Sequence, residues 1–212
     1  PATGVGMVKV MLVTGEGVPE MSVANSQESL IKNVLTQKET DMLVQGYDIY
    51  LTVTVSPKED VSELQQEQTA GWILKRPENG GIVGYYDISM TKQTGDDGEK
   101  IPVTQTVAKL ILKAGRPDES GMTDGTTREY QMLIFNGGDI QELVTVREDD
   151  GKIRFATDQT GTIVLVYHDT AVTPDNPSDK PGNTPPDNPT DTLGNPLSDD
   201  PSDNPGNDHG DS

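Results

Sequence analysis

The hydrophobic pattern of the chain is strongest in the stretch KIRFATDQTGTIVLVYHD, which begins at Lys152. Two apolar runs, 153–157 and 162–167, are joined by a turn through residues 158–161. From Ile163 onward the second run, IVLVY, is apolar at every position rather than at alternate positions. This pattern is typical of a strand buried on both faces, so we predict that it lies near the middle of the core.

Alternating apolar and polar residues predict further strands before this stretch. The clearest is 47–55, YDIYLTVTV, in which Ile49, Leu51, Val53 and Val55 share one face. The stretch 85–92 also alternates, with one face formed by Tyr86, Ile88 and Met90. The run 7–13, MVKVMLV, is an earlier strand candidate, and 19–26 continues as a weak, edge-like segment.

Helix signals are confined to the first third of the chain. Thr36 followed by Glu39 forms a capping box, and Gly46 stands at the expected C-terminal cap, so we predict a helix over 36–45. The polar stretch 59–69 has Val61 and Leu64 at helical spacing and predicts a second short helix. We place 72–74 after this helix and predict a loop over 77–81. Residues 29–35 suit either a strand or the start of a helix.

From residue 82 the pattern becomes a series of short strands separated by turns, which is typical of a β-sandwich. The strands are expected at 101–113, 129–135 and 140–146, with a long polar loop at 115–127. The turns are Gly95-Asp96-Asp97-Gly98, Asn136-Gly137-Gly138-Asp139 and Asp149-Asp150-Gly151. We therefore predict a mainly β protein, an immunoglobulin-like β-sandwich over about 82–170, with an N-terminal β-rich lobe that carries two short helices.

The last forty residues differ from the rest in composition. Residues 172–212 are rich in Pro, Asp, Asn and Gly, and the phrase Pro-Asp-Asn-Pro occurs at 174–177 and 186–189. Such a composition does not form a packed core, so we predict a disordered, acidic spacer. Residues 1–171 then form the β-rich module, either as one unit or as two lobes, 1–82 and 83–171.

Charge limits the range of partners. The net charge is −19, divided into −11 for residues 1–170 and −8 for residues 171–212. Phosphate backbones and anionic membranes attract Lys and Arg, so we expect no nucleic acid partner and no adsorption to such membranes. No apolar run approaches the roughly 20 residues of a membrane span. The chain has no cysteine and begins at Pro1, and we expect it to be a piece of a longer exported protein.

The motifs for catalysis and metal binding are weak. Asp96, Asp97, Asp149 and Asp150 occur in pairs, but each pair precedes a glycine as hairpin turns require, and the calcium-loop spacing is missing. His168 stands beside Asp169 without a nucleophile motif. We predict no catalytic residue, no metal and no cofactor, and hence no enzyme.

Two aromatic residues are the candidate ligand contacts. Trp72 and Tyr85, with the neighbouring Tyr86, could form a platform on which a sugar ring stacks. Packing in the core or across strands is the alternative for the same residues. Lys9 raises the further hypothesis of a Lys–Asn isopeptide bond, for which the sequence names no partner.

The order of several segments resembles a known bacterial module. The segments are Val34-Leu35-Thr36-Gln37-Lys38-Glu39, Gln45-Gly46-Tyr47-Asp48-Ile49, Leu51–Val55, Gly84-Tyr85-Tyr86-Asp87-Ile88-Ser89-Met90-Thr91-Lys92, Ile101-Pro102-Val103-Thr104, Arg128-Glu129-Tyr130 and Ile153-Arg154-Phe155-Ala156-Thr157-Asp158. Together they resemble a module that recurs in large surface and secreted proteins of Gram-positive (clostridial-type) bacteria, often before a proline-rich cell-wall spacer. The chain departs from that pattern at 134–138 and 159–163.

The resemblance implies a β-sandwich, an extracellular, cell-wall-associated location and no catalysis. We therefore expect a structural, stalk-like accessory module whose partners are the neighbouring domains of its parent protein. The alternative is an adhesion module that binds cell-wall or host glycans or host proteins through Trp72 and Tyr85. The resemblance names no ligand.

Overall fold

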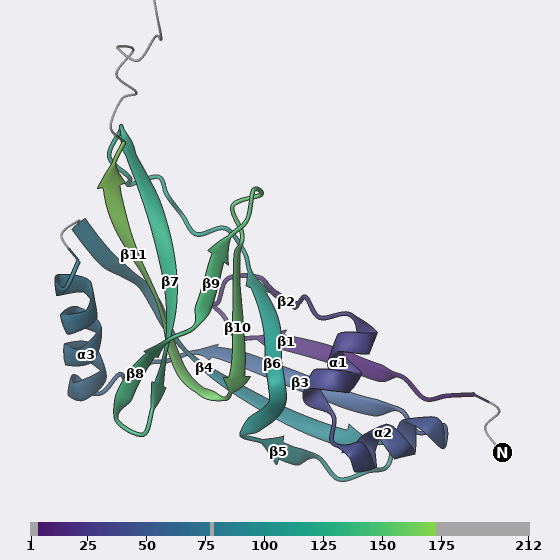
Figure 1. Ribbon diagram of the computed structural model, residues 1–212. Coiled ribbons are helices and arrows are strands. Elements are labelled where there is room, and N and C mark those ends of the chain that lie inside the picture. Colours follow the sequence, from purple (N-terminus) through teal and green to yellow (C-terminus); the bar gives the residue numbers. More distant parts are fainter. Residues whose placement is uncertain (1–3, 77–78, 173–212) are drawn as a thin grey trace, which may run out of the picture. The chain divides into compact units, whose positions relative to one another are not determined.

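The computed structural model describes residues 4–76 and 79–172. These residues form two β-sheets and three short helices, which confirms the prediction of a mainly β, sandwich-like protein (Figure 1). They belong to one compact unit, Pro1–Thr173. The predicted spacer lies outside the described residues, apart from its first residue.

The first sheet contains strands from both halves of the chain. Along its hydrogen-bonded path the order is β1 (Val8–Thr14), β3 (Ile49–Pro57), β4 (Asn79–Thr94), β11 (Gly161–Ala171), β7 (Thr126–Asn136) and β8 (Asp139–Glu142), and β5 (Ile101–Val103) pairs with β4. Strands β1 and β3 are parallel, and every other neighbouring pair is antiparallel. The two strands β1 and β3, which were expected in an N-terminal lobe, therefore extend the same sheet as the later strands.

The second sheet is smaller. Its order is β2 (Met21–Val23), β6 (Gln105–Ala114), β10 (Ile153–Gln159) and β9 (Val144–Arg147). The chain crosses between the sheets at Leu143, which separates β8 from β9, and again at Thr160, which separates β10 from β11.

The predictions of one strand over 140–146 and of one strand over 101–113 were wrong, because each stretch is divided between the two sheets. The predicted turn over 158–161 was also wrong, because β10 continues to Gln159 and only Thr160 separates it from β11. Leu143 packs against the core while its backbone N–H donates to the Met132 carbonyl (2.9 Å), and this contact divides the stretch 140–146 between two sheets.

The main core lies where the two sheets face each other. Ile49, Leu51, Val53 and Val55 are completely buried, so their predicted common face is confirmed. Strand β11 is buried on both faces, as predicted. Ile163 and Leu165 enter the main core, whereas Val164 and Val166 enter a smaller cluster with Trp72 and Leu133 on the other side of the sheet.

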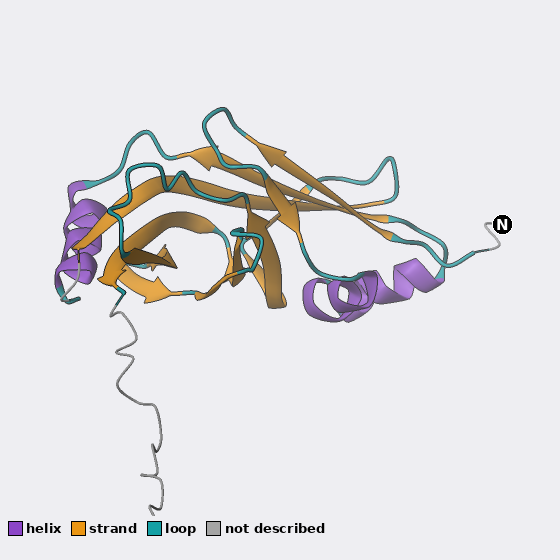
Figure 2. Cartoon of the chain, turned by 90° about the horizontal axis from the view of Figure 1, so that it is seen from above, coloured by secondary structure: helices purple, strands orange, loops and turns teal. Residues whose placement is uncertain are grey.

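Three helices cover this sandwich, and Figure 2 shows α3 at the opposite end from α1 and α2. Helix α1 (Gln27–Val34) settles the alternative left open for 29–35, with Ser26 as its N-cap. Helix α2 (Gln37–Val44) has the predicted capping box between Thr36 and Glu39, and Gly46 follows with a φ of 91°. Helix α3 (Glu63–Leu74) begins with a second capping box, from Ser62 to Gln65.

The sequence placed the boundary between α3 and β4 incorrectly. Residues 72–74 form the last turn of α3, and Asn79, Gly80 and Gly81 belong to β4 rather than to a loop. Glycine is common in loops, which favoured the wrong assignment. In the structure a Cβ at Gly81 would lie 2.6 Å from the Tyr167 hydroxyl oxygen, so glycine is needed here because the Tyr167 side chain crosses the strand.

Candidate functional site

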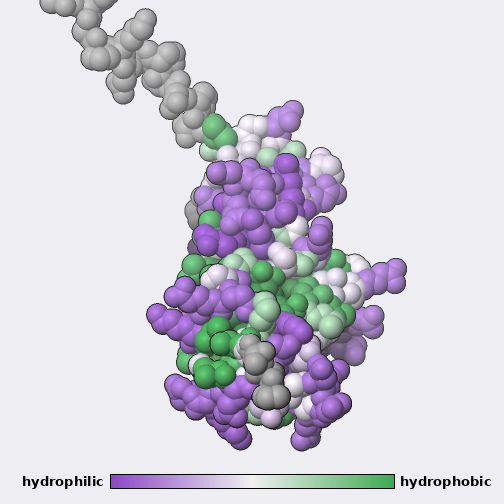
Figure 3. All heavy atoms as spheres, turned by 90° about the vertical axis from the view of Figure 1, so that its right-hand side faces the viewer, coloured by the Kyte–Doolittle hydropathy of each residue, from purple (hydrophilic) through white to green (hydrophobic). Residues whose placement is uncertain are grey.

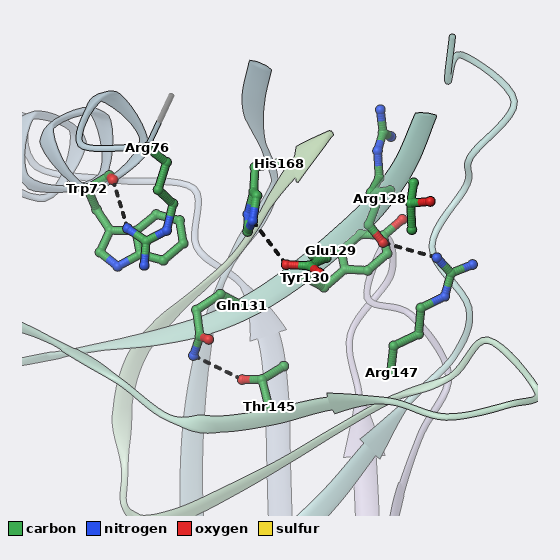
Figure 4. A pocket seen from close by; sticks show the side chains of 10 residues that line it. Trp72, Arg76, Arg128, Glu129, Tyr130, Gln131, Thr145, Arg147 and His168 are labelled. Carbon is green, nitrogen blue, oxygen red and sulfur yellow. Dashed lines mark hydrogen bonds and ion pairs between the residues drawn. The ribbon is translucent and has the colours of Figure 1, made fainter. Parts of the chain in front are cut away.

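A cavity of about 380 Å³ opens where α3, β7, β9 and β11 come together (Figure 4). Its lining residues are Trp72, Arg76, Thr127, Arg128, Glu129, Tyr130, Gln131, Thr145, Arg147 and His168. Residues 127–131 are consecutive in β7, so their side chains alternate between the two faces of the sheet. The cavity therefore follows the edge of β7 and is lined from both faces.

Trp72 and Tyr85, the two predicted ligand contacts, pack in the smaller cluster between α3 and the first sheet. The Trp72 side chain is 7% exposed, and the Tyr85 ring is stacked against Phe135 with centroids 6.4 Å apart. Of the two, only Trp72 reaches the cavity. Trp72 attaches α3 to the sheet, and Tyr85 packs across strands against Phe135, so both have the packing role considered as their alternative.

The face of the Trp72 indole is occupied. The Arg76 guanidinium carbon lies 3.2 Å from the ring centroid, and the indole Nε1 donates a hydrogen bond to Glu142 (2.7 Å). The same Glu142 oxygen accepts from Arg76 (2.8 Å). The two hydrogen bonds hold the pKa of Glu142 below its usual value, and the one from Trp72 has the larger effect. A sugar could stack on this face of the ring only after displacing Arg76.

Arginine is the distinctive component of the cavity. The chain contains five arginines, and three of them, Arg76, Arg128 and Arg147, line this one site. They come from α3, β7 and β9, so the tertiary structure brings together residues that are up to 71 positions apart. Each is paired with a carboxylate: Glu142, Asp169 and Glu119, respectively. The pairing fixes the directions in which the three guanidinium groups point.

The pair of Arg128 and Asp169 is the most buried of the three. The residues lie opposite each other on β7 and β11, and Arg128 donates from Nε and Nη2 to the two carboxylate oxygens, both at 2.7 Å. The guanidinium also lies 3.7 Å from the centroid of the Tyr167 ring. The hydrogen bonds from Arg128 lower the pKa of Asp169 and raise that of Arg128.

The lowered pKa of Asp169 predicts a loss of stability in acid. The stabilisation is complete above the pKa that Asp169 has in the unfolded chain, about 3.9, and is lost as the pH falls through the lower pKa of the folded state. We expect Asp169→Asn to lower the free energy of unfolding by about 2 kcal/mol at neutral pH. When the pH is lowered from about 6 to about 3, the variant should lose less stability than the wild type, because it has no carboxylate to protonate at this position. Urea unfolding at both pH values measures this. The control is Asp124→Asn in an exposed loop, and equal pH dependence of the wild type and Asp169→Asn would contradict the prediction.

The long loop at 115–127 is attached to the cavity through Glu119. This carboxylate accepts hydrogen bonds from the Tyr130 hydroxyl, from Arg147 and from Arg116, each at 3.0 Å. Burial, followed by the hydrogen bond to Glu119, raises the pKa of Tyr130 to about 12. Tyr130 therefore stays neutral at physiological pH and donates its proton to Glu119.

The floor of the cavity is polar. His168 lies opposite Glu129 across β11 and β7, with its Nε2 3.1 Å from a Glu129 oxygen, while its Nδ1 is buried and has no hydrogen-bond partner among the described residues. Gln131 donates to the Thr145 hydroxyl (3.2 Å) (Figure 4). None of the ten lining residues is a serine, so a Ser–His–Asp arrangement is not formed around His168.

The other candidates from the sequence have structural roles. The Asp96–Asp97 and Asp149–Asp150 pairs lie in turns, and Gly95 and Gly151 beside them have positive φ values of 70° and 81°. Among the described residues, no group of three or more His, Asp or Glu side chains could hold a metal ion. Lys9 forms an ion pair with Asp48 (2.6 Å). Within the described part of the chain, no helix is long and apolar enough to cross a membrane.

Sequence reasoning missed the arginine cluster. Arg76, Arg128 and Arg147 are not joined by any local motif, and they line one cavity only because α3 and β9 approach β7 from different sides. The one feature of the sequence that could have indicated these residues is the scarcity of arginine, which occurs only five times in 212 residues.

No protein-family model, curated protein or solved structure matches this chain.

Proposed function

We propose that the chain is a non-catalytic structural module of a large bacterial cell-surface protein, and that it carries mechanical load between its two ends. The observation that supports this function is the relation between the first and last strands. Both β1 and β11 lie in one sheet and run in the same direction, so the module is loaded in shear when its ends are pulled apart.

The direction of β11 follows from the strand pairings. Strand β1 is parallel to β3, β3 is antiparallel to β4, and β4 is antiparallel to β11. Two antiparallel steps restore the original direction, so β11 is parallel to β1. The chain therefore enters β1 at one end of the sheet and leaves β11 at the other end (Figure 1).

This arrangement suits a load-bearing element. A pull along the strands loads the ladders β1–β3, β3–β4 and β4–β11 parallel to their length, and many backbone hydrogen bonds must then break together. Each backbone hydrogen bond contributes only about 1 kcal/mol to stability. Simultaneous breaking of a whole ladder nevertheless presents a higher barrier than breaking its bonds one after another.

Contact with neighbouring domains is part of this proposal. The end of the module where β1 begins exposes the apolar side chains of Val5, Met7 and Val44, with exposed fractions of 71%, 56% and 69%. Figure 3 looks onto this end and shows hydrophobic side chains gathered in the middle of the face, with hydrophilic ones around them. An exposed apolar patch of this kind suits contact with another domain.

The extracellular, cell-wall-associated location is proposed from the sequence. The resemblance to Gram-positive surface modules, the absence of cysteine and the Pro- and Asp-rich stretch after residue 171 support it. We propose that this stretch acts as an extended spacer, because proline stiffens a chain and like charges repel.

Single-molecule pulling tests the structural function. The chain has no cysteine, so Gly4→Cys together with Val172→Cys provides unique attachment points at the two ends of the module. We expect a single unfolding event at a high force, because this geometry loads the ladders in shear.

The matched control pulls the same protein through Gly4→Cys and Asp97→Cys. The turn that contains Asp97 lies beside the start of β3, because Gly95 N–H donates to the Asp48 carbonyl (2.7 Å). Pulling between these points separates β1 from the sheet one hydrogen bond at a time, so we expect a clearly lower force. Equal forces in the two geometries would refute load bearing.

Recognition of a glycan or a host protein is the second candidate function. The observation that favours it is the arginine-lined cavity, which the load-bearing role does not require.

A further inference from the structure

We infer that two copies of this chain pair side by side through β1, so that their first sheets join in one continuous sheet. Strand β1 lies at the edge of its sheet. It is hydrogen-bonded to β3 on one side, and β2, the next strand along the chain, pairs with β6 in the second sheet instead. A free edge carries unpaired N–H and C=O groups and is a template for pairing with a further strand. This inference is independent of load bearing.

The free backbone groups belong to alternate residues of β1. The side-chain amide of Gln27 accepts from the Val8 N–H (3.2 Å) and donates to the Val8 carbonyl (2.5 Å), so the backbone groups of Val8 face away from β3. Because backbone groups alternate between the two sides of a strand, those of Val10, Leu12 and Thr14 face the same way as those of Val8. They have no hydrogen-bond partner among the described residues. Gln27 therefore ends the free edge at Val8, and the other three residues remain available for pairing.

Strand β1 lacks the features by which natural proteins shield an edge. It is seven residues long, contains no proline, and pairs with β3 without a bulge. Its one charged residue, Lys9, is held in an ion pair with Asp48 (2.6 Å). The opposite edge of the same sheet, β8, has only four residues and is attached to α3 by the hydrogen bond from Trp72 to Glu142. One edge is therefore short and covered, whereas the other is long and open.

Both faces of β1 carry apolar side chains that are incompletely covered. On the outer face of the sheet, Met11 and Val13 are 59% and 42% exposed. On the inner face, Val10 and Leu12 pack against the main core but are only partly buried. A strand that adds to this edge and has apolar residues on both of its own faces would cover both sets. Strand β1 itself, with the sequence VKVMLVT, is such a strand.

One register of two antiparallel copies satisfies all of these groups together. It places Leu12 opposite Leu12 of the second copy and Val10 opposite Thr14, and the residues of each pair exchange two backbone hydrogen bonds. Between them, Met11 lies opposite Val13 of the second copy, once on each side of the two-fold axis. The exposed apolar side chains of the outer face then cover each other. Because the free backbone groups and the exposed side chains match in the same register, a second copy fits this edge without any further component.

The dimer is expected to be weak and to respond to salt in a characteristic way. Two short strand edges bury less surface than the roughly 1,200–2,000 Å² of a standard interface, so association needs a high protein concentration. Each copy also has a net charge of −19, and the two copies repel each other. Salt screens this repulsion. Association through β1 should therefore strengthen as NaCl is added, whereas an interface held by ion pairs would weaken.

Disulfide cross-linking tests the register, because the chain has no cysteine of its own. Met11→Cys and Val13→Cys are prepared as separate full-length proteins and mixed under mild oxidation. In the mixture the two positions face each other with about 4.5 Å between their Cα atoms, whereas two copies of one variant place them diagonally, about 7–8 Å apart. A disulfide needs Cα atoms about 4.4–6.8 Å apart. We expect cross-linked dimers to form about ten-fold faster in the mixture than with either variant alone.

Sedimentation velocity measures the self-association of the full-length protein and of two lysine variants. Met11→Lys places a charge against Val13 of the second copy twice in each dimer, so we expect the affinity to fall about ten-fold or more. The matched control is Val107→Lys in β6 of the second sheet, where the valine is 64% exposed. It should leave the affinity unchanged. Both substitutions are at exposed positions, so both variants should keep the thermal transition of the wild type.

Three outcomes would overturn the inference. The first is a folded wild-type protein that stays monomeric up to about 1 mM at high salt. The second is cross-linking of either cysteine variant alone at the same rate as in the mixture. The third is an equal loss of affinity in Met11→Lys and Val107→Lys, which would indicate association through another surface. The pulling experiment uses single molecules and does not depend on any of these outcomes, so the two proposals can fail separately.

Discussion

Trp72→Ala is expected to lower the free energy of unfolding by about 3–5 kcal/mol. The indole is 7% exposed and packs between α3 and the first sheet, so its removal leaves a cavity beside Leu133 and Val164. Glu142 and Arg76 also lose a partner. Because small domains have a total stability of about 5–15 kcal/mol, we expect α3 to be released or the whole domain to be severely destabilised.

Urea unfolding followed by circular dichroism measures this change, since the variant has no tryptophan to report fluorescence. The control is Leu74→Ala, two residues later in the same helix, where the leucine is 82% exposed. A change within about 0.5 kcal/mol is expected there. Similar small effects at both positions would contradict the role of Trp72 in attaching α3.

Ile163→Ala is expected to cost about 2–5 kcal/mol, because it removes a fully buried side chain from the central strand. Ile163 lies opposite Tyr86 on β4 and Ile134 on β7, and all three belong to the main core between the sheets. Its site is enclosed on all sides by regular structure, so the surrounding residues have little freedom to fill the cavity. Urea unfolding followed by Trp72 fluorescence measures the loss.

Ile101→Ala provides the matched control for this prediction. Ile101 is also a strand isoleucine, but it lies in β5 and is 60% exposed. The same change in side-chain volume should therefore cost little at this position. A cost at Ile101 as large as that at Ile163 would contradict the assignment of β11 as the centre of the core.

Local patterns identified most of the elements correctly, because each pattern has a local physical cause. The capping box of Thr36 and Glu39 closes within one helical turn, and the alternation from Ile49 to Val55 reflects one buried face of a single strand. The uniformly apolar run from Ile163 also needs only its own composition to indicate burial on both faces. Errors occurred at Gly80 and Gly81, where the distant Tyr167 leaves no room for a side chain, and at Leu143, where the chain changes from one sheet to the other.

The candidate site was only partly predictable. Trp72 and Tyr85 were identified as unusual residues in a chain with few aromatics, and the structure places them in one cluster. Their role could not be derived, because the neighbour that covers the indole, Arg76, and the partner of its N–H, Glu142, are recognised only in three dimensions. The same holds for Arg128 and Arg147.

The sequence by itself determined the mainly β class, the capping of α2, the glycine-containing hairpin turns and the burial of the final strand, because these depend on hydrogen bonds and hydrophobic periodicity within a few residues. The tertiary structure decided which strands share a sheet and which side chains share a cavity. The parallel relation of β1 and β11 depends on three successive strand pairings, whose paired residues lie between 29 and 90 positions apart along the chain. The arginine cavity depends on the meeting of α3, β7 and β9. Both features arise from long-range packing, in which the contribution of each residue depends on neighbours that its own segment does not specify.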